Sequence, residues 1–96
     1  MQLQKWQDLI RRTYLQRDRK RGLPKDFMWF VEEVGELSEA LRFGSQEELE
    51  GEFADCLAWL TTLANLTGVD LEKAIEKYRR GCPSCGKIPC GCKGRL

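Results

Sequence analysis

The sequence contains no histidine, and this absence narrows the chemistry available to it. A histidine general base and a zinc site with histidine ligands are both excluded. If the protein catalyses a reaction that moves a proton, a carboxylate or a metal-bound hydroxide has to accept that proton.

Long apolar runs and strand patterns are also missing. The longest weakly polar run, 56–66, is shorter than the roughly 20 residues that span a bilayer. The N-terminus is charged and lacks the apolar core of a signal peptide, so we expect a soluble cytoplasmic protein without a membrane partner. Alternation with a period of two is absent, and Val, Ile and Thr are sparse, so no strand is predicted.

Apolar residues instead recur at spacings of three and four, which predicts helices. Glycines separate these segments, Ser45 and Glu48 form a capping-box pattern, and Asp70 can cap the last segment. The expected helices are Leu3 to Lys20, Lys25 to Phe43, Gln46 to Leu66 and Leu71 to Arg80.

A chain of 96 residues predicts one small core that benefits from a partner copy. We therefore predict an all-α fold, an antiparallel bundle of about four helices in residues 1–80. Oligomerisation, as a homodimer or homotetramer, would complete it. Residues 81–96 are predicted to form a separate cysteine-rich tail.

Charge is strongly segregated along the chain. The net charge is +5 over residues 1–21, −10 over residues 22–72 and +6 over residues 73–96. An acidic centre with basic flanks suits a metal core with cationic arms for phosphate. For the flanks alone, we favour the simpler interpretation that helices carry solvated charges on their outer faces.

Two acidic clusters dominate the acidic centre: Glu32, Glu33 and Glu36, then Glu52 and Asp55. Residues three apart share a helix face, so two such pairs on antiparallel neighbours can converge between the helices. Crowded carboxylates near a core repel one another, and a bound divalent cation relieves that repulsion. The pattern predicts a magnesium site, because Mg²⁺ takes oxygen ligands together with substrate phosphates. A solvated acidic face is the structural alternative.

The spacing of these acids resembles that of the MazG-like nucleotide pyrophosphohydrolases. The resemblance rests on Glu-Glu-x-x-Glu at 32–36, Glu-x-x-Asp at 52–55 and Asn-Leu-Thr-Gly-Val-Asp-Leu-Glu at 65–72, and it covers roughly residues 1–80. It is closest to the compact single-domain archaeal or bacterial type. The resemblance implies hydrolysis of a nucleoside triphosphate to the monophosphate and pyrophosphate. It further implies magnesium ligands at Glu33, Glu36, Glu52 and Asp55, with Glu32 serving a further metal or the attacking water.

The same resemblance implies that aromatic and amide groups read the base of the nucleotide. The candidates are Trp6, Trp59 and Asn65, each of which can alternatively be a core or helix-end residue, and this alternative is favoured for Trp29. Lys73 and Lys77 are candidates to reach the triphosphate, although each can equally be a solvated surface residue. Family members assemble as dimers or tetramers.

The tail holds cysteines in a C-x2-C-x4-C-x-C arrangement: Cys82, Cys85, Cys90 and Cys92. Four thiolates with intervening Gly and Pro predict a closed zinc knuckle. Disulfides and an iron–sulfur cluster are the alternatives. Cys56 is interpreted as a small buried apolar residue.

Two other functions compete with hydrolysis. One is a nucleic-acid-binding module that uses the zinc knuckle and the basic flanks. The acidic centre disfavours this module, because it repels phosphate unless metals neutralise it. The other is a non-catalytic helical oligomerisation domain, which leaves both acidic clusters unexplained.

Overall fold

The computed structural model describes residues 1–94 and confirms an all-α fold, with no strand in that range. The last two residues of the predicted tail lie outside the described residues. The elements are α1 (Leu3–Arg21), α2 (Leu23–Phe43), α3 (Gln46–Thr67), α4 (Leu71–Ala74) and a 3-10 turn, η1 (Ile75–Tyr78). None of these helices is long and apolar enough to cross a membrane.

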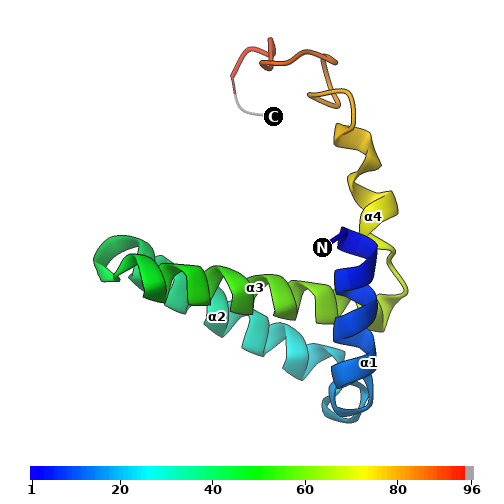
Figure 1. Cartoon of the computed structure of the whole chain (residues 1–96), viewed down its shortest axis with the longest axis vertical. Helices are drawn as coiled ribbons and strands as arrows, with labels where there is room; N and C mark the ends of the chain where they lie inside the picture. The colour runs from blue at the N-terminus through cyan, green and yellow to red at the C-terminus, as the bar shows by residue number, and fades with distance from the viewer. Residues whose placement is uncertain (95–96) are drawn as a thin grey trace.

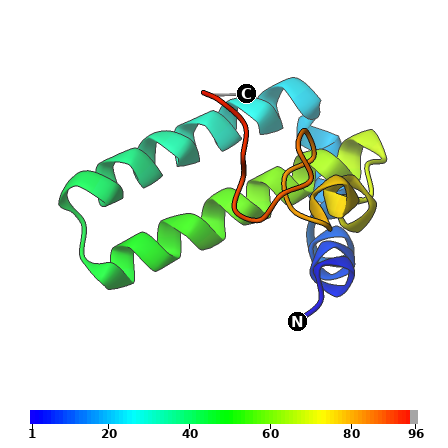
Figure 2. The ribbon, with the colours of Figure 1, turned by 90° about the horizontal axis from the view of Figure 1, so that it is seen from above.

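Helices α2 and α3 form an antiparallel hairpin, and α1 crosses one end of it (Figure 1). Only Gly44 and Ser45 join the two helices, so they must turn back on each other. The predicted capping box is confirmed: Ser45 Oγ accepts from the Glu48 amide at 3.1 Å, and the Glu48 carboxylate accepts from the Ser45 amide at 3.4 Å. Figure 2 shows α2 and α3 lying side by side, with the short connection between them at the end far from α1.

The fourth helix is shorter than the sequence predicts. Asp70 caps it as expected, since its carboxylate accepts from the amides of Glu72 and Lys73. The α-helix nevertheless ends at Ala74, and the expected range to Arg80 is replaced by η1 and a turn. From Glu72 to Arg80 every residue is exposed, so little tertiary packing supports a longer helix.

An ion network fixes the corner between α1 and α2. Gly22, with φ +91°, lets the two helices meet with a single residue between them. The Arg21 guanidinium donates from Nε to Asp26 at 2.7 Å and also pairs with Asp18. Asp18 in turn accepts from the Thr62 hydroxyl at 3.0 Å, which attaches the corner to α3.

Little apolar surface is buried within one chain. Among the residues that the structure describes, the buried apolar ones are Ile10, Ala40 and Ala64. Large apolar side chains of the hairpin are instead exposed; they include Phe27, Val31, Val34, Leu41, Phe53, Leu57 and Leu60. The single chain thus presents much of its apolar surface to its surroundings.

The corner network yields a stability prediction. Both carboxylates that pair with Arg21 are buried, so Arg21→Ala leaves two buried charges without their cation. We expect the free energy of unfolding to fall by about 3 kcal/mol. The matched control is Arg12→Ala, whose partner Asp8 is exposed to solvent, and which should cost less than about 1 kcal/mol. Urea unfolding measures both, and equal losses in the two variants would contradict this role of the network.

Candidate metal centre

Three predicted carboxylates meet between α2 and α3. Glu33, Glu36 and Glu52 each place an oxygen within 4.8 Å of the others. Glu33 and Glu36 are three residues apart on α2, and the antiparallel return of the chain brings Glu52 of α3 beside them. This is the convergence predicted from the spacing, and it could hold a metal ion.

Two of the three carboxylates in this cluster are poorly solvated, whereas Glu36 is exposed. Glu33 and Glu52 are half-buried, and within the described residues one buried oxygen of each has no hydrogen-bond partner. Burial, followed by the charge of Glu36, raises the pKa of Glu33 to about 7. The same two causes raise the pKa of Glu52. Buried acceptor oxygens that no protein group satisfies are a suitable donor set for a hard divalent cation.

The remaining two acids lie at the edge of this cluster. Asp55 is exposed and stands outside the three converging oxygens, although its charge contributes to the raised pKa of Glu33. Glu32 is exposed on α2, next to Glu33. The prediction of Asp55 as a magnesium ligand, and of Glu32 for a further metal or the attacking water, therefore stays a prediction.

A cavity of about 300 Å³ is lined by Asp55, Trp29 and Trp59 among others, and we call it the aromatic cavity. Trp29 and Trp59 meet edge to face in its wall, with ring centroids 5.5 Å apart. The Arg21 guanidinium lies 5.0 Å from the Trp29 ring and 5.3 Å from the Trp59 ring. Two indoles and a planar cation form a surface on which a flat aromatic group can stack.

A wider hollow of about 560 Å³ lies toward the hairpin turn. Glu36 and Glu52 contribute to its wall, together with Glu39, Glu48 and Phe43. Glu36 and Glu52 of the carboxylate cluster therefore line this hollow, whereas Asp55, which stands outside the cluster, lines the cavity beside the two tryptophans.

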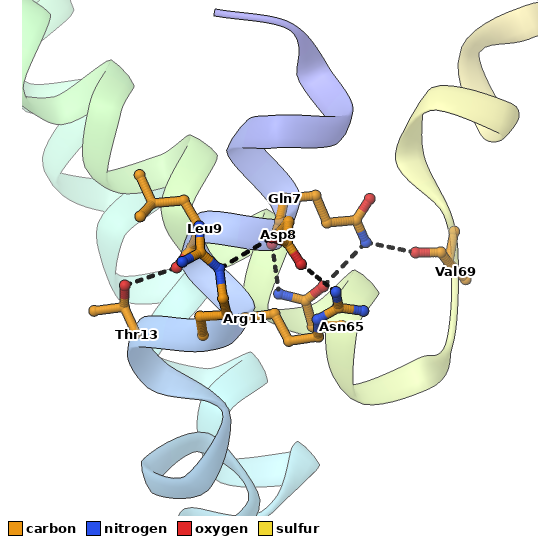
Figure 3. A network of polar contacts seen from close by, with 8 residues as sticks. Gln7, Asp8, Leu9, Arg11, Thr13, Asn65 and Val69 are labelled. Atoms are coloured by element: carbon orange, nitrogen blue, oxygen red, sulfur yellow. Dashed lines mark hydrogen bonds and ion pairs between the residues drawn. The ribbon is translucent and has the colours of Figure 1, made fainter.

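Two predicted base-binding residues, Trp6 of α1 and Asn65 of α3, lie away from the carboxylate cluster. The Trp6 indole donates to Thr61 Oγ1 at 2.8 Å, and Asn65 Oδ1 accepts from the Gln7 amide at 3.1 Å. Figure 3 shows Gln7 between Asn65 and Val69, whose carbonyl it reaches at 2.7 Å. Asn65 follows Asp55 by ten residues, about 15 Å along the helix. Within one chain, these two side chains join α1 to α3 and stand apart from the carboxylates.

The two predicted phosphate-binding lysines lie beyond the hairpin. Lys73 is exposed on α4, and Lys77 is exposed on η1, where its Nζ lies 5.4 Å from the centroid of the Tyr78 ring. Neither belongs to the cavity lining beside the carboxylates.

Arg21 and Asp18 also line the aromatic cavity, and neither was predicted as a site residue from the sequence. The spacing of three between them is a signal of an ion pair on one helix face. It could not reveal that Thr62 and the two tryptophans surround that pair. Trp29, expected in the core, is 38% exposed and faces this cavity.

The four cysteines of the tail form a second cluster, in which each Sγ lies within 4.8 Å of the others. Hydrogen bonds from the backbone amides of Cys85 and Ser84 lower the pKa of Cys82 to about 6. Hydrogen bonds with the other three cysteine side chains, that of Cys90 first, raise the pKa of Cys92 to about 12. Cys56 is separate: it is half-buried on α3, and burial raises its pKa.

Facing helices with inward carboxylates define a class of helical metal-binding domains. The chain matches the family model of the MazG nucleotide pyrophosphohydrolase domain over residues 26–86, which is more than half of its length. The protein belongs to this family. The match begins in the first turn of α2, so α1 lies outside it. No curated protein matches the chain.

The raised pKa of Glu33 predicts a pH dependence of stability. A carboxyl group whose pKa is raised by folding stabilises the folded state only while it is protonated. Without a divalent cation, the free energy of unfolding should therefore fall as the pH rises from about 4.5 to about 7. Glu33→Gln should flatten this decline.

The matched control is Glu50→Gln, which alters an exposed carboxylate of α3 outside the cluster and should keep the decline. Denaturant unfolding in chelator across this pH range measures all three proteins. If the free energy of unfolding of Glu33→Gln declines with pH as that of the parent does, burial of Glu33 is not the cause of the decline.

Proposed function

We propose that the protein is a magnesium-dependent nucleoside triphosphate pyrophosphohydrolase. It would convert a ribo- or deoxyribonucleoside triphosphate and water to the monophosphate and pyrophosphate. Membership of the family supports the reaction class. The observation that carries the proposal is the convergence of Glu33, Glu36 and Glu52, in which one buried oxygen of Glu33 and one of Glu52 have no hydrogen-bond partner within residues 1–94.

Magnesium fits this donor set because the ligands are hard oxygens and the hollow beside Glu36 leaves room for water and phosphate. When bound, the ion neutralises phosphate charge and lowers the pKa of a coordinated water. We assign Glu33, Glu36, Glu52 and Asp55 as its ligands.

The chain's own residues would then orient the reaction. Glu32 lies beside the cluster on the exposed side of α2, and we propose its carboxylate as the acceptor of the proton that the attacking water loses. No histidine competes for this role. The half-buried positions of Glu33 and Glu52 hold their carboxylates between the two helices, which limits reorientation as charge develops.

We propose that the base of the nucleotide binds in the aromatic cavity. Trp59 lines it together with Asp55, so a base stacked on the indole would bring the phosphates toward the carboxylates. We retain Trp6 and Asn65 as proposed substrate contacts, and Lys73 and Lys77 as proposed phosphate contacts. The net charge of −10 over residues 22–72 argues against nucleic acid as the main partner.

The proposed reaction predicts the effect of two substitutions. Glu36→Gln and Asp55→Asn keep the side-chain shape and remove the charge. Each should lower turnover at least about a hundredfold, the scale seen when stabilisation of transition-state charge is lost. Glu50→Gln is the control and should stay within about twofold. Incubation with a panel of NTPs and dNTPs plus Mg²⁺, followed by identification of products, measures this. Release of orthophosphate with a diphosphate product would contradict the proposal, as would full activity in excess chelator.

We also propose that the active unit is a homo-oligomer, a dimer or a tetramer. The support is the set of exposed apolar side chains on α2 and α3, which we call the apolar stripe of the hairpin. It includes Phe27, which is 53% exposed, and Leu57, which is 43% exposed. Monomeric proteins seldom leave so much contiguous apolar surface in water, and a second copy of this chain would cover the same stripe symmetrically.

The assembly is tested by introducing charge into that stripe. Val31→Asp with Leu57→Asp should yield a monomer, because a carboxylate buried in an apolar interface is costly. Glu47→Lys, a change of charge in the exposed first turn of α3, is the control and should preserve assembly. Sedimentation equilibrium at micromolar concentration gives the masses. A parent protein that sediments as a monomer would contradict the proposal.

A further inference from the structure

The tail is the part of the described chain that the proposed hydrolysis does not use. Beyond η1 it leaves the helices and rises clear of α2 and α3 (Figure 1). Most of its side chains are exposed, and Ile88, its large aliphatic residue within the described range, is 80% exposed. Apolar burial therefore does not account for its compact turn. The family match ends at residue 86, between the two pairs of cysteines, so the matched region does not contain the complete thiol set.

The sulfur atoms are spaced for a single metal ion. Cys82 Sγ lies 3.7 Å from Cys92 Sγ, and Cys85 Sγ lies 4.0 Å from Cys90 Sγ. A tetrahedral ion with four bonds of about 2.3 Å places its sulfur ligands about 3.8 Å apart. All four cysteines are free thiols. A polynuclear iron–sulfur cluster attaches its cysteines to separate iron atoms, which requires wider spacing than this.

Backbone geometry holds the first pair in place. The Gly86 amide donates to the Cys82 carbonyl at 2.7 Å, and the Cys82 amide donates to the Lys87 carbonyl at 3.2 Å. Gly81 has φ +108°, and a Cβ there would lie 2.8 Å from the Lys87 carbonyl oxygen. The turn thus requires glycine at this point and fixes the positions of Cys82 and Cys85.

Backbone amides also point at sulfur. The Gly91 amide donates to Cys85 Sγ at 3.3 Å, and the Cys92 amide donates to Cys90 Sγ at 3.3 Å. Such bonds favour the thiolate, which is the form that binds metal. The Lys87 side chain passes beside Gly91, where an added Cβ would lie 3.4 Å from Nζ. Its charge would partly offset the net negative charge that four thiolates leave around a divalent ion.

We propose a structural zinc site with four thiolate ligands: Cys82, Cys85, Cys90 and Cys92. Thiolate is a soft ligand that selects zinc over magnesium, so this site does not compete for the ion of the carboxylate cluster. Four protein ligands fill the tetrahedron and leave no position for water, so the site has no part in hydrolysis. Its effect is to order residues 82–92, which have almost no apolar contacts to order them.

Elemental analysis of the full chain, purified without chelator, tests the proposal. We expect one zinc per chain. Cys85→Ser and Cys90→Ser should each lower the zinc content at least about tenfold, because both remove a ligand of a closed site. Cys56→Ser is the matched control: it also removes one thiol, but from α3 outside the cluster, and it should keep one zinc. Absence of zinc, iron in its place, cysteines joined in disulfides, or equal zinc in all three variants would overturn the proposal.

Limited digestion of the unmodified protein supplies a second measurement that does not depend on how a variant folds. Lys87 lies within the proposed metal loop, and trypsin cleaves after it only when the loop opens. Removal of zinc by a zinc-selective chelator, with magnesium kept in excess, should speed this cleavage at least about tenfold. Added zinc should restore the slow rate. A cleavage rate that is unchanged by chelator would overturn the proposal.

Discussion

Repulsion among carboxylates held between two packed helices is the constraint on which the rest of this molecule depends. Glu33, Glu36 and Glu52 approach one another because the two-residue connection forces α2 and α3 together, and the sequence places acids where such helices usually bury apolar groups. Burial then raises the pKa of Glu33 and of Glu52. A divalent cation would relieve this cost, so the low stability of the hairpin and the proposed metal site would be two consequences of the same arrangement.

The helices around that site must be held by other means. Few apolar side chains are buried within one chain, and polar connections do much of the positioning. The Arg21 network fixes the α1–α2 corner to α3 through Thr62. Gln7 ties α1 to Asn65 of α3 and to Val69 in the connection that follows α3. Directional bonds of this kind set the crossing of α1 without covering the apolar stripe of the hairpin. The stripe therefore stays available to a second copy, and the aromatic cavity stays open beside Asp55.

Local features of the structure could be predicted from the sequence, and long-range ones could not. Helix periodicity and a short connection were sufficient for the all-α fold and for the meeting of Glu33, Glu36 and Glu52, because both depend on residues near in sequence. The caps at Ser45 and Asp70 were predictable for the same reason. The end of the fourth helix at Ala74 was not, since it reflects missing tertiary support rather than propensity. The distance of Asn65 from the carboxylates follows from helix length, but its pairing with Gln7 follows from the crossing of α1.

The two clusters of potential ligands differ in chemistry as well as in place. The carboxylate cluster offers hard oxygens with open hollows beside it, which suits an ion that keeps water and takes phosphate. The thiol cluster offers four soft ligands whose sulfur–sulfur distances are close to those around one tetrahedral ion. It suits a structural ion that has four protein ligands and no bound water. Under the two proposals, ligand softness alone would direct magnesium and zinc to different parts of a chain of 96 residues. Because the thiol cluster lies beyond η1 and clear of the hairpin, the proposed ordering of the tail by zinc would not depend on the proposed chemistry at the carboxylates.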